Sequence, residues 1–390
     1  MKFPAALRVL AVIGTRPEVI KSAPVVRCLS AAADLFSVAV CKVEQQDGVL
    51  NAALAEWELE PAHTIEARTS RRTPLHLLAS VLPELEDLFC TEKPDLVLVQ
   101  GDTLTAFAGA LAAAYAGCPA AHVEAGLRSG HRAEPFPEEM HRLLIDQMAL
   151  ILYAPTPLAR DNLLRSGFAE EQIRVVGNTG IDAMRLMLGR LAGRGWRVEG
   201  EESIFPPPAK RCRRSLLVTA HRRESFDGGI DRLCTALREL VRQRADLEIH
   251  YVLHPNPRAH EPVRAHLDGA ERVRLLQPVG YRDFLSLLLN ADLVLTDSGG
   301  VQEEAPYLGK PVLIARDRTE RPEALELGTA ELVGTDPAAI TAAINRLLDC
   351  PELYRRRAVR TEPFGDGWAA ERIRDDLRQR FQEQGQGTAR

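Results

Sequence analysis

The chain has 390 residues, of which 45% are hydrophobic and 26% charged, a composition typical of a globular protein long enough for two domains. Its formal net charge of −5 gives no general attraction to nucleic acid or to an acidic membrane surface. No apolar run reaches the roughly 18 residues that span a bilayer, and the N-terminal apolar run ends in a turn, which favours a buried strand over a signal peptide. The seven cysteines are scattered without a CxxC pair, so we expect reduced thiols in a cytoplasmic protein and no zinc site.

Short apolar runs without polar alternation recur through the first half of the chain, each near a segment with helical spacing. Strands that are buried on both faces and alternate with helices are typical of a parallel sheet with crossover helices. The pattern predicts strands over residues 9–13, 38–40, 96–99, 151–153 and 173–176, and helices over residues 18–31, 75–89, 104–116 and 139–149.

A second series of the same kind follows, with predicted strands over residues 215–219, 249–253, 273–275, 293–296 and 312–315, and helices over residues 230–242, 258–266, 281–289, 302–308 and 337–349. The stretch 189–210, rich in Arg, Gly and Glu, is interpreted as a helix end and an exposed connection, with the hinge just before it near Asn178. We therefore predict an α/β protein with two Rossmann-like, doubly wound parallel-sheet domains. They comprise residues 1–178, joined by a C-terminal helix within 366–390, and residues 179–365. Ligands bind at the carboxyl ends of strands in such sheets, so we expect a cleft between the domains.

Two turns at predicted strand ends in the first domain carry charged residues. The turn Gly14-Thr15-Arg16-Pro17-Glu18 opens directly into a helix. Its free backbone N–H groups, together with Arg16 and Lys21, suit an anionic diphosphate, although an ordinary strand–helix turn has the same pattern. Asp102 follows the strand 96–99 and either caps the next helix or points into the cleft as a carboxylate.

Two further acidic residues of the first domain are candidates for chemistry. Glu124 lies among small and apolar residues at the end of another expected strand. A carboxylate there is costly to bury unless it is paired or functional, and Arg128 is the candidate partner. Glu138 begins a helix whose next turn carries Arg142, although an acid in a first helical turn is also a common partner of the helix dipole.

The second domain places different groups at its strand ends. His221 follows the strand 215–219 and precedes two arginines, which makes it a candidate general acid beside phosphate, although a lone loop histidine usually has no such role. The turn Asp297-Ser298-Gly299-Gly300 lets the backbone approach a phosphate at a helix N-terminus. Glu304, one turn later, is a candidate acceptor for a ribose diol, and Arg321 offers a contact to a diphosphate or a nucleobase.

Together these segments resemble the UDP-N-acetylglucosamine 2-epimerase family, particularly its bacterial non-hydrolysing branch. The resemblance runs from about Val12 to Ile373 and rests on blocks that occur in the family's order: GTRPE, GDT, HVEAGLR, PEE, GNTGIDA, TAHRRE, HPNP, TDSGGVQEEAP, GKPV, TERPEA and GDGWA. It implies the two-domain glycosyltransferase-B fold and a UDP-sugar substrate. It also implies a reaction without a metal or redox cofactor, a place in the supply of cell-surface polysaccharide precursors and, from the family alone, a homodimer.

The resemblance also implies roles for individual positions. The family's essential acid–base set matches Asp102, Glu124, Glu138 and His221. Its substrate-binding positions match Arg16, Lys21, Arg142, Phe284, Ser298, Gly299, Gly300, Glu304 and Arg321. The family's reaction begins with anti elimination of UDP across C1–C2 of the sugar to give 2-acetamidoglucal. UDP then adds back while a proton arrives on the opposite face.

One region departs from the family's pattern. The family usually has a Gln-His pair after the second strand, in a loop linked to activation by the substrate; here Gln45 fits, but Gln46 stands where His is expected. The candidate activator-site residues are Gln45, Gln46, Arg222 and His254. The departure leaves open a related substrate such as UDP-2,3-diacetamido-2,3-dideoxyglucuronic acid. A UDP-sugar glycosyltransferase on the same fold and a non-catalytic nucleotide-sugar sensor are the remaining alternatives.

Overall fold

The computed structural model describes residues 6–45, 49–69, 73–132, 134–192, 213–221 and 228–387. The chain folds into two compact units. Unit 1 comprises Met1–Leu186 and Phe364–Arg390, and unit 2 comprises Met187–Pro363. Among the described residues, no helix has both the length and the apolar character needed to cross a membrane.

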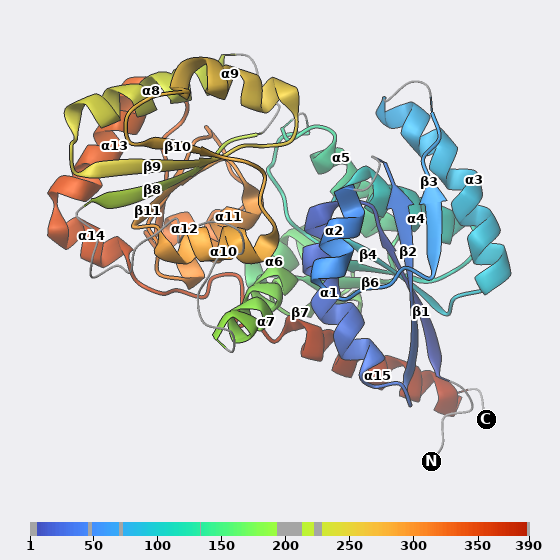
Figure 1. Cartoon of the computed structure of the whole chain (residues 1–390). Helices are drawn as coiled ribbons and strands as arrows, with labels where there is room; N and C mark the ends of the chain where they lie inside the picture. The colour runs from blue at the N-terminus through green and yellow to red at the C-terminus, as the bar shows by residue number, and fades with distance from the viewer. Residues whose placement is uncertain are drawn as a thin grey trace. The chain divides into compact units, whose positions relative to one another are not determined.

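Unit 1 is built on a parallel sheet in which the described strands lie in the order β3-β2-β1-β4-β5-β6-β7. These strands are β1 (Leu7–Ile13), β2 (Phe36–Glu44), β3 (His63–Glu66), β4 (Leu96–Gln100), β5 (Ala120–Val123), β6 (Ile151–Ala154) and β7 (Ile173–Val175). The helical segments are α1 (Arg16–Ser30), α2 (Val49–Glu56), α3 (Pro74–Glu92), α4 (Leu104–Tyr115), α5 (Glu138–Met148), α6 (Pro157–Arg165), the short η1 (Glu170–Gln172), the first part of α7 (Thr179–Ala192) and α15 (Ala369–Gly387). Helix α1 packs against α2 and α15, whereas α4 packs against α3 and α5, so two helical layers cover the sheet (Figure 1).

Unit 2 repeats this plan with strands in the order β10-β9-β8-β11-β12-β13. The strands are β8 (Arg214–Thr219), β9 (Leu247–Val252), β10 (Val273–Leu276), β11 (Leu293–Thr296), β12 (Val312–Ile314) and β13 (Ala330–Leu332). The helices are α8 (Gly229–Gln243), α9 (Pro257–Leu267), α10 (Tyr281–Asn290), α11 (Gly299–Tyr307), α12 (Glu323–Glu326), α13 (Pro337–Asp349) and α14 (Pro351–Arg357). Figure 1 shows α8 and α9 on one face of this sheet and α10, α11 and α12 on the other. The predicted α/β class with two doubly wound parallel sheets is confirmed.

The central strands form because they are mostly apolar and lie buried between two helical layers. All five residues of β4, with the sequence LVLVQ, are buried, as are the last five of the six residues of β8. Strands β3 and β13 escaped prediction because they lie at the sheet edges and are short, with only one fully buried residue each. A strand that pairs on one side only needs few apolar residues, so its sequence has a weak signal.

The division between the units lies at Leu186–Met187, within α7, whereas the sequence placed the hinge near Asn178. The first half of α7 stays with unit 1 because the start of α15 holds it. The Asp182 carboxylate accepts a hydrogen bond from the Ala370 N–H at 2.8 Å. The Arg185 guanidinium donates to the Gly367 carbonyl at 2.6 Å and lies 4.0 Å from the centre of the Trp368 ring.

Each sheet has one point at which the strand order reverses. In unit 1 the chain builds outward from β1 to β2 and β3 and then returns to add β4 on the other side of β1. In unit 2 the same reversal occurs between β8 and β11. The carboxyl ends of the two strands at such a point diverge and leave a crevice, which is where open α/β sheets bind ligands. Most of the candidate residues predicted from the sequence follow these four strands or the neighbouring β5.

Candidate active site

The loops after β1 and β4 are held together at the reversal point of unit 1. Gly14 directly follows β1, at a position where a Cβ atom would lie 2.0 Å from the Thr105 hydroxyl oxygen, so only glycine fits. The Glu18 carboxylate, which is fully buried, accepts hydrogen bonds from the Gly14 N–H at 3.1 Å and from the Thr103 hydroxyl at 2.7 Å. Burial raises the pKa of Glu18 to about 7, while the bonds from Thr103 and Gly14 act in the opposite direction. Arg16 is the first residue of α1 and lies partly buried on the same turn.

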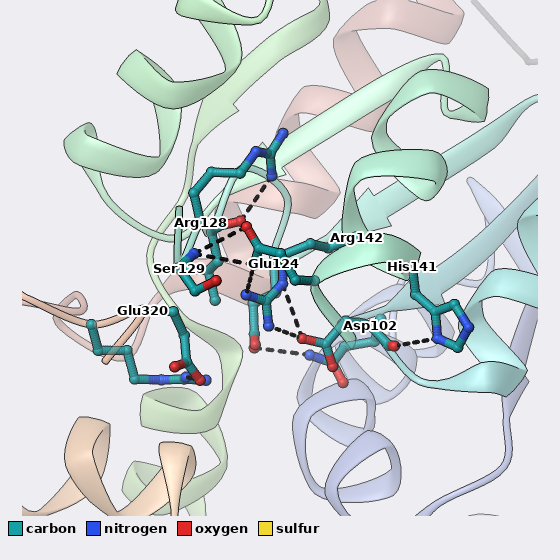
Figure 2. Close-up of polar contacts among 12 residues, drawn as sticks. Asp102, Glu124, Arg128, Ser129, His141, Arg142 and Glu320 are labelled. Carbon is teal, nitrogen blue, oxygen red and sulfur yellow. Dashed lines mark hydrogen bonds and ion pairs between the residues drawn. The ribbon is translucent and has the colours of Figure 1, made fainter. Parts of the chain in front are cut away.

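Asp102, the first candidate acid, is paired with Arg142 from α5. The Arg142 Nε atom lies 3.1 Å from Asp102 Oδ2, and a second guanidinium nitrogen contacts the same oxygen (Figure 2). The alternative that Asp102 caps α4 is wrong, because Thr103 is the capping residue and its hydroxyl accepts the Ala106 N–H at 3.0 Å. Since the Asp102 side chain keeps 24% of its surface exposed, one face of this ion pair is open to a ligand.

Arg142 connects Asp102 to a second carboxylate that the sequence did not single out. Arg142 Nη1 lies 2.6 Å from Glu139 Oε2, and both Glu139 oxygens accept the Ser129 N–H at 3.1 Å. Glu139 is 2% exposed, whereas the predicted Glu138 is the partly exposed first residue of α5. Glu139 therefore holds the arginine from its buried side, whereas Glu138 keeps part of its surface exposed.

Glu124 lies directly after β5 with a left-handed backbone conformation, φ = +75°. A residue other than glycine costs energy in that conformation, and such strain is concentrated at functional sites. The Glu124 carboxylate pairs with the Lys21 ammonium and accepts the Gln100 amide at 2.9 Å, with 7% of its side chain exposed. The predicted partner, Arg128, is wrong: Arg128 instead contacts Asp146 at 2.7 Å. The pairing with Lys21 joins α1 to β5, two elements that are distant in the sequence.

In unit 2, His221 is held by a buried acid at the β8–β11 reversal point. The His221 N–H donates to Asp297 Oδ2 at 2.8 Å, and its Nδ1 atom lies 3.2 Å from Asp297 Oδ1. Asp297 is fully buried, while a third of the His221 side chain remains exposed. The His254 ring stacks on the His221 ring with a centroid distance of 4.9 Å and an interplanar angle of 8°. The carboxylate and the stacked ring thus fix the orientation of the imidazole.

The loop after β11 brings backbone groups to the N-terminus of α11. Ser298 occupies the N-cap position, and its N–H donates to the Thr296 hydroxyl at 2.9 Å. At Gly299 a Cβ atom would lie 2.6–2.8 Å from three atoms of the Arg321 guanidinium, whereas at Gly300 nothing lies within 4 Å. The first turn of a helix presents unsatisfied N–H groups, so this loop is suited to bind an anion.

The remaining nucleotide-site candidates lie on α10, α11 and the loop after β12. Glu304 accepts the Tyr281 hydroxyl at 2.9 Å, and Phe284 is partly exposed on α10. Arg321 is 5% exposed; its Nε lies 2.5 Å from Glu303 Oε1, and a second nitrogen contacts Glu320. Since these contacts bury Arg321 beneath the Ser298–Gly300 loop, it supports that loop as well as being a candidate nucleotide contact.

Comparison with known proteins identifies the family. The sequence profile described as UDP-N-acetylglucosamine 2-epimerase matches residues 31–378. The chain belongs to the UDP-N-acetylglucosamine 2-epimerase family. It is 41% identical over 373 residues to the enzyme of that name from Yersinia pestis, covering 94% of this chain and 97% of the relative. The resemblance stated from the motifs is thereby confirmed.

Solved structures of the 2-epimerase family have the same fold. The UDP-GlcNAc 2-epimerase from Neisseria meningitidis, solved with UDP-GlcNAc bound, superposes with a TM-score of 0.92 at 35% identity, covering 95% of this chain and 99% of the other. The Methanocaldococcus jannaschii UDP-GlcNAc 2-epimerase, solved with UDP-GlcNAc and UDP, gives a TM-score of 0.83 at 34% identity, with the same coverage. The chain therefore has the glycosyltransferase-B type of fold expected from the motifs.

Two of the candidate activator-site residues of this 2-epimerase family member lie within the described residues, one in each unit. Gln45 donates to the Thr105 hydroxyl at 2.8 Å in unit 1, whereas His254 stacks on His221 in unit 2. Gln46 and Arg222 lie outside the described residues. Among the described residues, no group of three or more His, Cys, Asp and Glu side chains is placed to hold a metal ion.

Several site residues were missed by sequence reasoning. They are Glu18, Gln100, Glu139, Asp146, Tyr281 and Asp297, and each contacts or neighbours a predicted residue. Nothing in the sequence pattern indicates that Glu18 and Glu139 are buried, because an acidic residue in the first turn of a helix is ordinary. Asp297 directly follows β11 and is thus an acidic residue after a buried strand, like Asp102 and Glu124. The same pattern could therefore have marked it as a candidate.

Proposed function

We propose that this chain is a non-hydrolysing UDP-N-acetylglucosamine 2-epimerase that interconverts UDP-GlcNAc and UDP-ManNAc in the cytoplasm. The observation that carries the proposal is the set of acids at the carboxyl edge of unit 1. Asp102 and Glu124 each have a cationic partner, Arg142 and Lys21, and Glu138 opens the helix that carries Arg142. Inversion at a carbon without an adjacent carbonyl group needs both a base and an acid, and this edge supplies both.

The proposed reaction proceeds by elimination and re-addition. A carboxylate removes the C2 proton, the C2–H electron pair forms the C1–C2 double bond, and the C1–O bond breaks so that UDP leaves with its electron pair. The product pair is UDP and 2-acetamidoglucal. A proton is then delivered to the opposite face of C2, and the UDP β-phosphate oxygen bonds to C1 again. The sum is inversion at C2 with no net oxidation.

We assign the proton transfers at C2 to the acids of unit 1. The cationic partners Lys21 and Arg142 favour the ionised forms of Glu124 and Asp102, which suits proton acceptance. Glu138, partly exposed at the start of α5, is the candidate that delivers a proton on the other face. General acid–base groups of this kind typically contribute on the order of 10²–10⁴-fold to the rate.

We assign the diphosphate and nucleotide to unit 2. His221, oriented by Asp297, protonates the departing β-phosphate, and the N–H groups of the Ser298–Gly300 loop stabilise its charge. Glu304, held by Tyr281, accepts hydrogen bonds from the ribose, and Phe284 packs beside the uracil.

The proposal is tested by proton NMR of a reaction in deuterated water. UDP-GlcNAc should be converted to a mixture with UDP-ManNAc, and the new product should carry deuterium at C2, because the abstracted proton exchanges before a solvent-derived one is delivered. Parallel reactions contain UDP-2,3-diacetamido-2,3-dideoxyglucuronic acid, or UDP-GlcNAc with sugar acceptors. Conversion without deuterium at C2, or consumption only when an acceptor is present, would overturn the proposal.

We also propose that the enzyme acts as a homodimer through the helical face formed by α3, α4 and α5. Met140 and Leu144, one helical turn apart on α5, are 39% and 42% exposed, and Leu75 on α3 and Tyr115 at the end of α4 are 72% and 84% exposed. Exposed apolar side chains on packed neighbouring helices are typical of an oligomer interface. Sedimentation of wild type and Leu144→Glu should give a dimer and a monomer respectively, and a wild-type monomer at micromolar concentration would contradict this proposal.

A further inference from the structure

A buried histidine joins the three segments of unit 1 that carry the candidate acids. His122 lies on β5, two residues before Glu124, and its side chain is fully buried. Its Nδ1 atom lies 2.7 Å from Asp146 Oδ1 on α5, and its Nε2 atom lies 2.8 Å from the Gly101 carbonyl oxygen. Gly101 directly precedes Asp102, so the ring spans from α5 to the loop after β4.

The partners of His122 determine its protonation. A carbonyl oxygen can only accept a hydrogen bond, so Nε2 must carry a proton. The Asp146 carboxylate is also fully buried, and its second oxygen, Oδ2, accepts an N–H of Arg128 at 2.7 Å. A carboxylate beside a guanidinium is ionised and accepts only, so Nδ1 must carry a proton as well. Both ring nitrogens then donate, and the ring is an imidazolium.

The charges around His122 agree with this state. Among the described residues, the ion pairs around α5 and the loops after β4 and β5 contain four carboxylates and three fixed cations, namely Asp102, Glu124, Glu139 and Asp146 with Lys21, Arg128 and Arg142. An imidazolium at His122 supplies the fourth positive charge. Buried charges are tolerated when they are paired and hydrogen-bonded, so the positive ring balances this group of residues.

We propose that His122 is a doubly protonated positioning residue that fixes the Asp102 backbone relative to Glu124 and Arg142. Gly101 is held to β5 through both of its backbone groups, because its N–H donates to the Val123 carbonyl at 2.9 Å while its carbonyl accepts from His122. Gly101 has φ = +71°, so the chain turns sharply there, and Asp102 follows the turn. The catalytic consequence rests on the proposed 2-epimerase function, whereas the protonation state does not.

The chain contains a matched control for the protonation argument. His250 on β9 of unit 2 is also fully buried, and its Nδ1 atom lies 3.2 Å from the Ser215 hydroxyl oxygen. A hydroxyl group can donate or accept, so this contact does not require a proton on Nδ1. The two histidines thus have equal burial and different partner chemistry.

The first experiment is nitrogen-detected NMR of the full chain with ¹⁵N-labelled histidine at a pH of about 8, where an unperturbed imidazole is mostly neutral. We expect both ring nitrogens of His122, assigned by its loss in His122→Gln, to have the shifts of protonated nitrogens, each coupled to a proton. His250, assigned in the same way, is the reference. One unprotonated ring nitrogen at His122 would overturn the proposal, whether or not the chain is an epimerase.

The second experiment separates the two contacts of His122 by substitution. The amide introduced by His122→Gln can reach the position of Nε2 and donate to Gly101, whereas the shorter side chain introduced by His122→Asn can reach only the position of Nδ1. We expect kcat to fall about 100-fold in His122→Asn with KM changed by less than about threefold, because misplacement of an acid–base group affects the transition state rather than substrate binding. The kcat of His122→Gln should lie between those of His122→Asn and the wild type, and His250→Gln should keep the wild-type kcat.

The outcomes of the second experiment are distinct from failure of the proposed function. Wild-type protein without 2-epimerase activity would remove the proposed function and leave the NMR result to decide the charge of His122. An active wild type, with His122→Asn folded by circular dichroism and equally active, would overturn the positioning role. Equal losses of kcat in the Gln and Asn variants would also overturn it, since the contact with Gly101 would then not matter.

Discussion

The two sheets share the order of their first six strands, but the carboxyl edges of these sheets carry different chemistry. At the β1–β4 reversal of unit 1 the functional groups are charged side chains in buried pairs, such as Glu124 with Lys21 and Asp102 with Arg142. At the β8–β11 reversal of unit 2 they are a histidine on a buried acid and a glycine loop at a helix N-terminus.

This difference follows from the two tasks in the proposed reaction. Moving a proton requires titratable side chains whose charge is set by their partners, and unit 1 supplies them from β4, β5 and α5. Holding a diphosphate requires close backbone approach and donors that need not change charge, and unit 2 supplies them from the loop after β11. One backbone plan thus suits both tasks, because the residues that follow the strands differ between the two units.

The largest effect should come from removing one charge at the edge of unit 1. Asp102→Asn keeps the shape of the side chain but removes the negative charge that faces Arg142. We expect kcat for UDP-GlcNAc epimerisation to fall on the order of 10²–10⁴-fold, with UDP affinity nearly unchanged because the nucleotide is assigned to unit 2. Steady-state kinetics and calorimetric UDP titration measure the two quantities.

The matched control for Asp102→Asn is Asp95→Asn. Asp95 is also paired with an arginine, Arg8, but both side chains are exposed, at 39% and 52%. This variant should retain the wild-type kcat. If Asp102→Asn kept more than about a tenth of the wild-type rate, the assignment of proton transfer to unit 1 would be untenable.

A second test asks whether the buried ion pairs of Arg321 in unit 2 stabilise the fold. Arg321→Met leaves Glu303 and Glu320 without this partner in a buried setting, where a carboxylate is costly. We expect the free energy of unfolding to fall by about 3–5 kcal/mol, measured by urea denaturation. Arg346→Met removes a half-exposed partner of Glu331 and should cost less than about 1 kcal/mol. Equal losses in the two variants would show that the Arg321 pairs do not support the fold.

A third test uses the buried acid that joins the two loops of unit 1. The pKa of Glu18 is raised by burial from 4.5 to about 7, so between these values the folded state binds more protons than the unfolded state. Stability therefore falls as the pH rises through this window, and the loss is complete above the folded pKa. For a shift of this size the loss is about 3 kcal/mol.

Glu18→Gln does not titrate, so it should lack this part of the pH dependence. The difference in unfolding free energy between variant and wild type should move by about 3 kcal/mol in favour of the variant between about pH 5 and pH 8. Glu66→Gln, at an exposed residue paired with Arg68, should follow the wild-type curve. Parallel curves for Glu18→Gln and wild type would mean that Glu18 is ionised throughout.

The sequence was sufficient for the fold and for the members of the two ion pairs, but not for the way they pair. Buried runs such as LVLVQ in β4 marked the strands, and acids at strand ends marked Asp102 and Glu124 as candidates. The partners were not predictable, because Lys21 lies 103 positions from Glu124 and becomes its neighbour only through the sheet. Arg128, near in sequence, was therefore the wrong choice. Pairing across a fold depends on strand order, which no local pattern contains.

The smallest expected effect separates the two glycines of the phosphate-loop candidate in unit 2. A Cβ atom at Gly299 would lie 2.6–2.8 Å from the Arg321 guanidinium, whereas Gly300 has no atom within 4 Å of that position. Gly299→Ala must therefore displace a buried side chain and should lower the free energy of unfolding by about 1–3 kcal/mol. Gly300→Ala should leave the stability of the free protein within about 0.5 kcal/mol of the wild type.

Binding of UDP distinguishes loop support from direct contact with the phosphate. If the backbone at Gly300 approaches the diphosphate, the methyl group added by Gly300→Ala fills space that the ligand needs. UDP binding should then weaken about tenfold or more, which corresponds to about 1.4 kcal/mol of binding free energy, while the stability of the protein is unchanged. Urea denaturation and calorimetric titration of the same samples measure both effects. A Gly300→Ala protein with wild-type UDP affinity would place the diphosphate away from this loop. The comparison between the two sheet edges would then hold for proton transfer alone, because the backbone of unit 2 would have no demonstrated ligand.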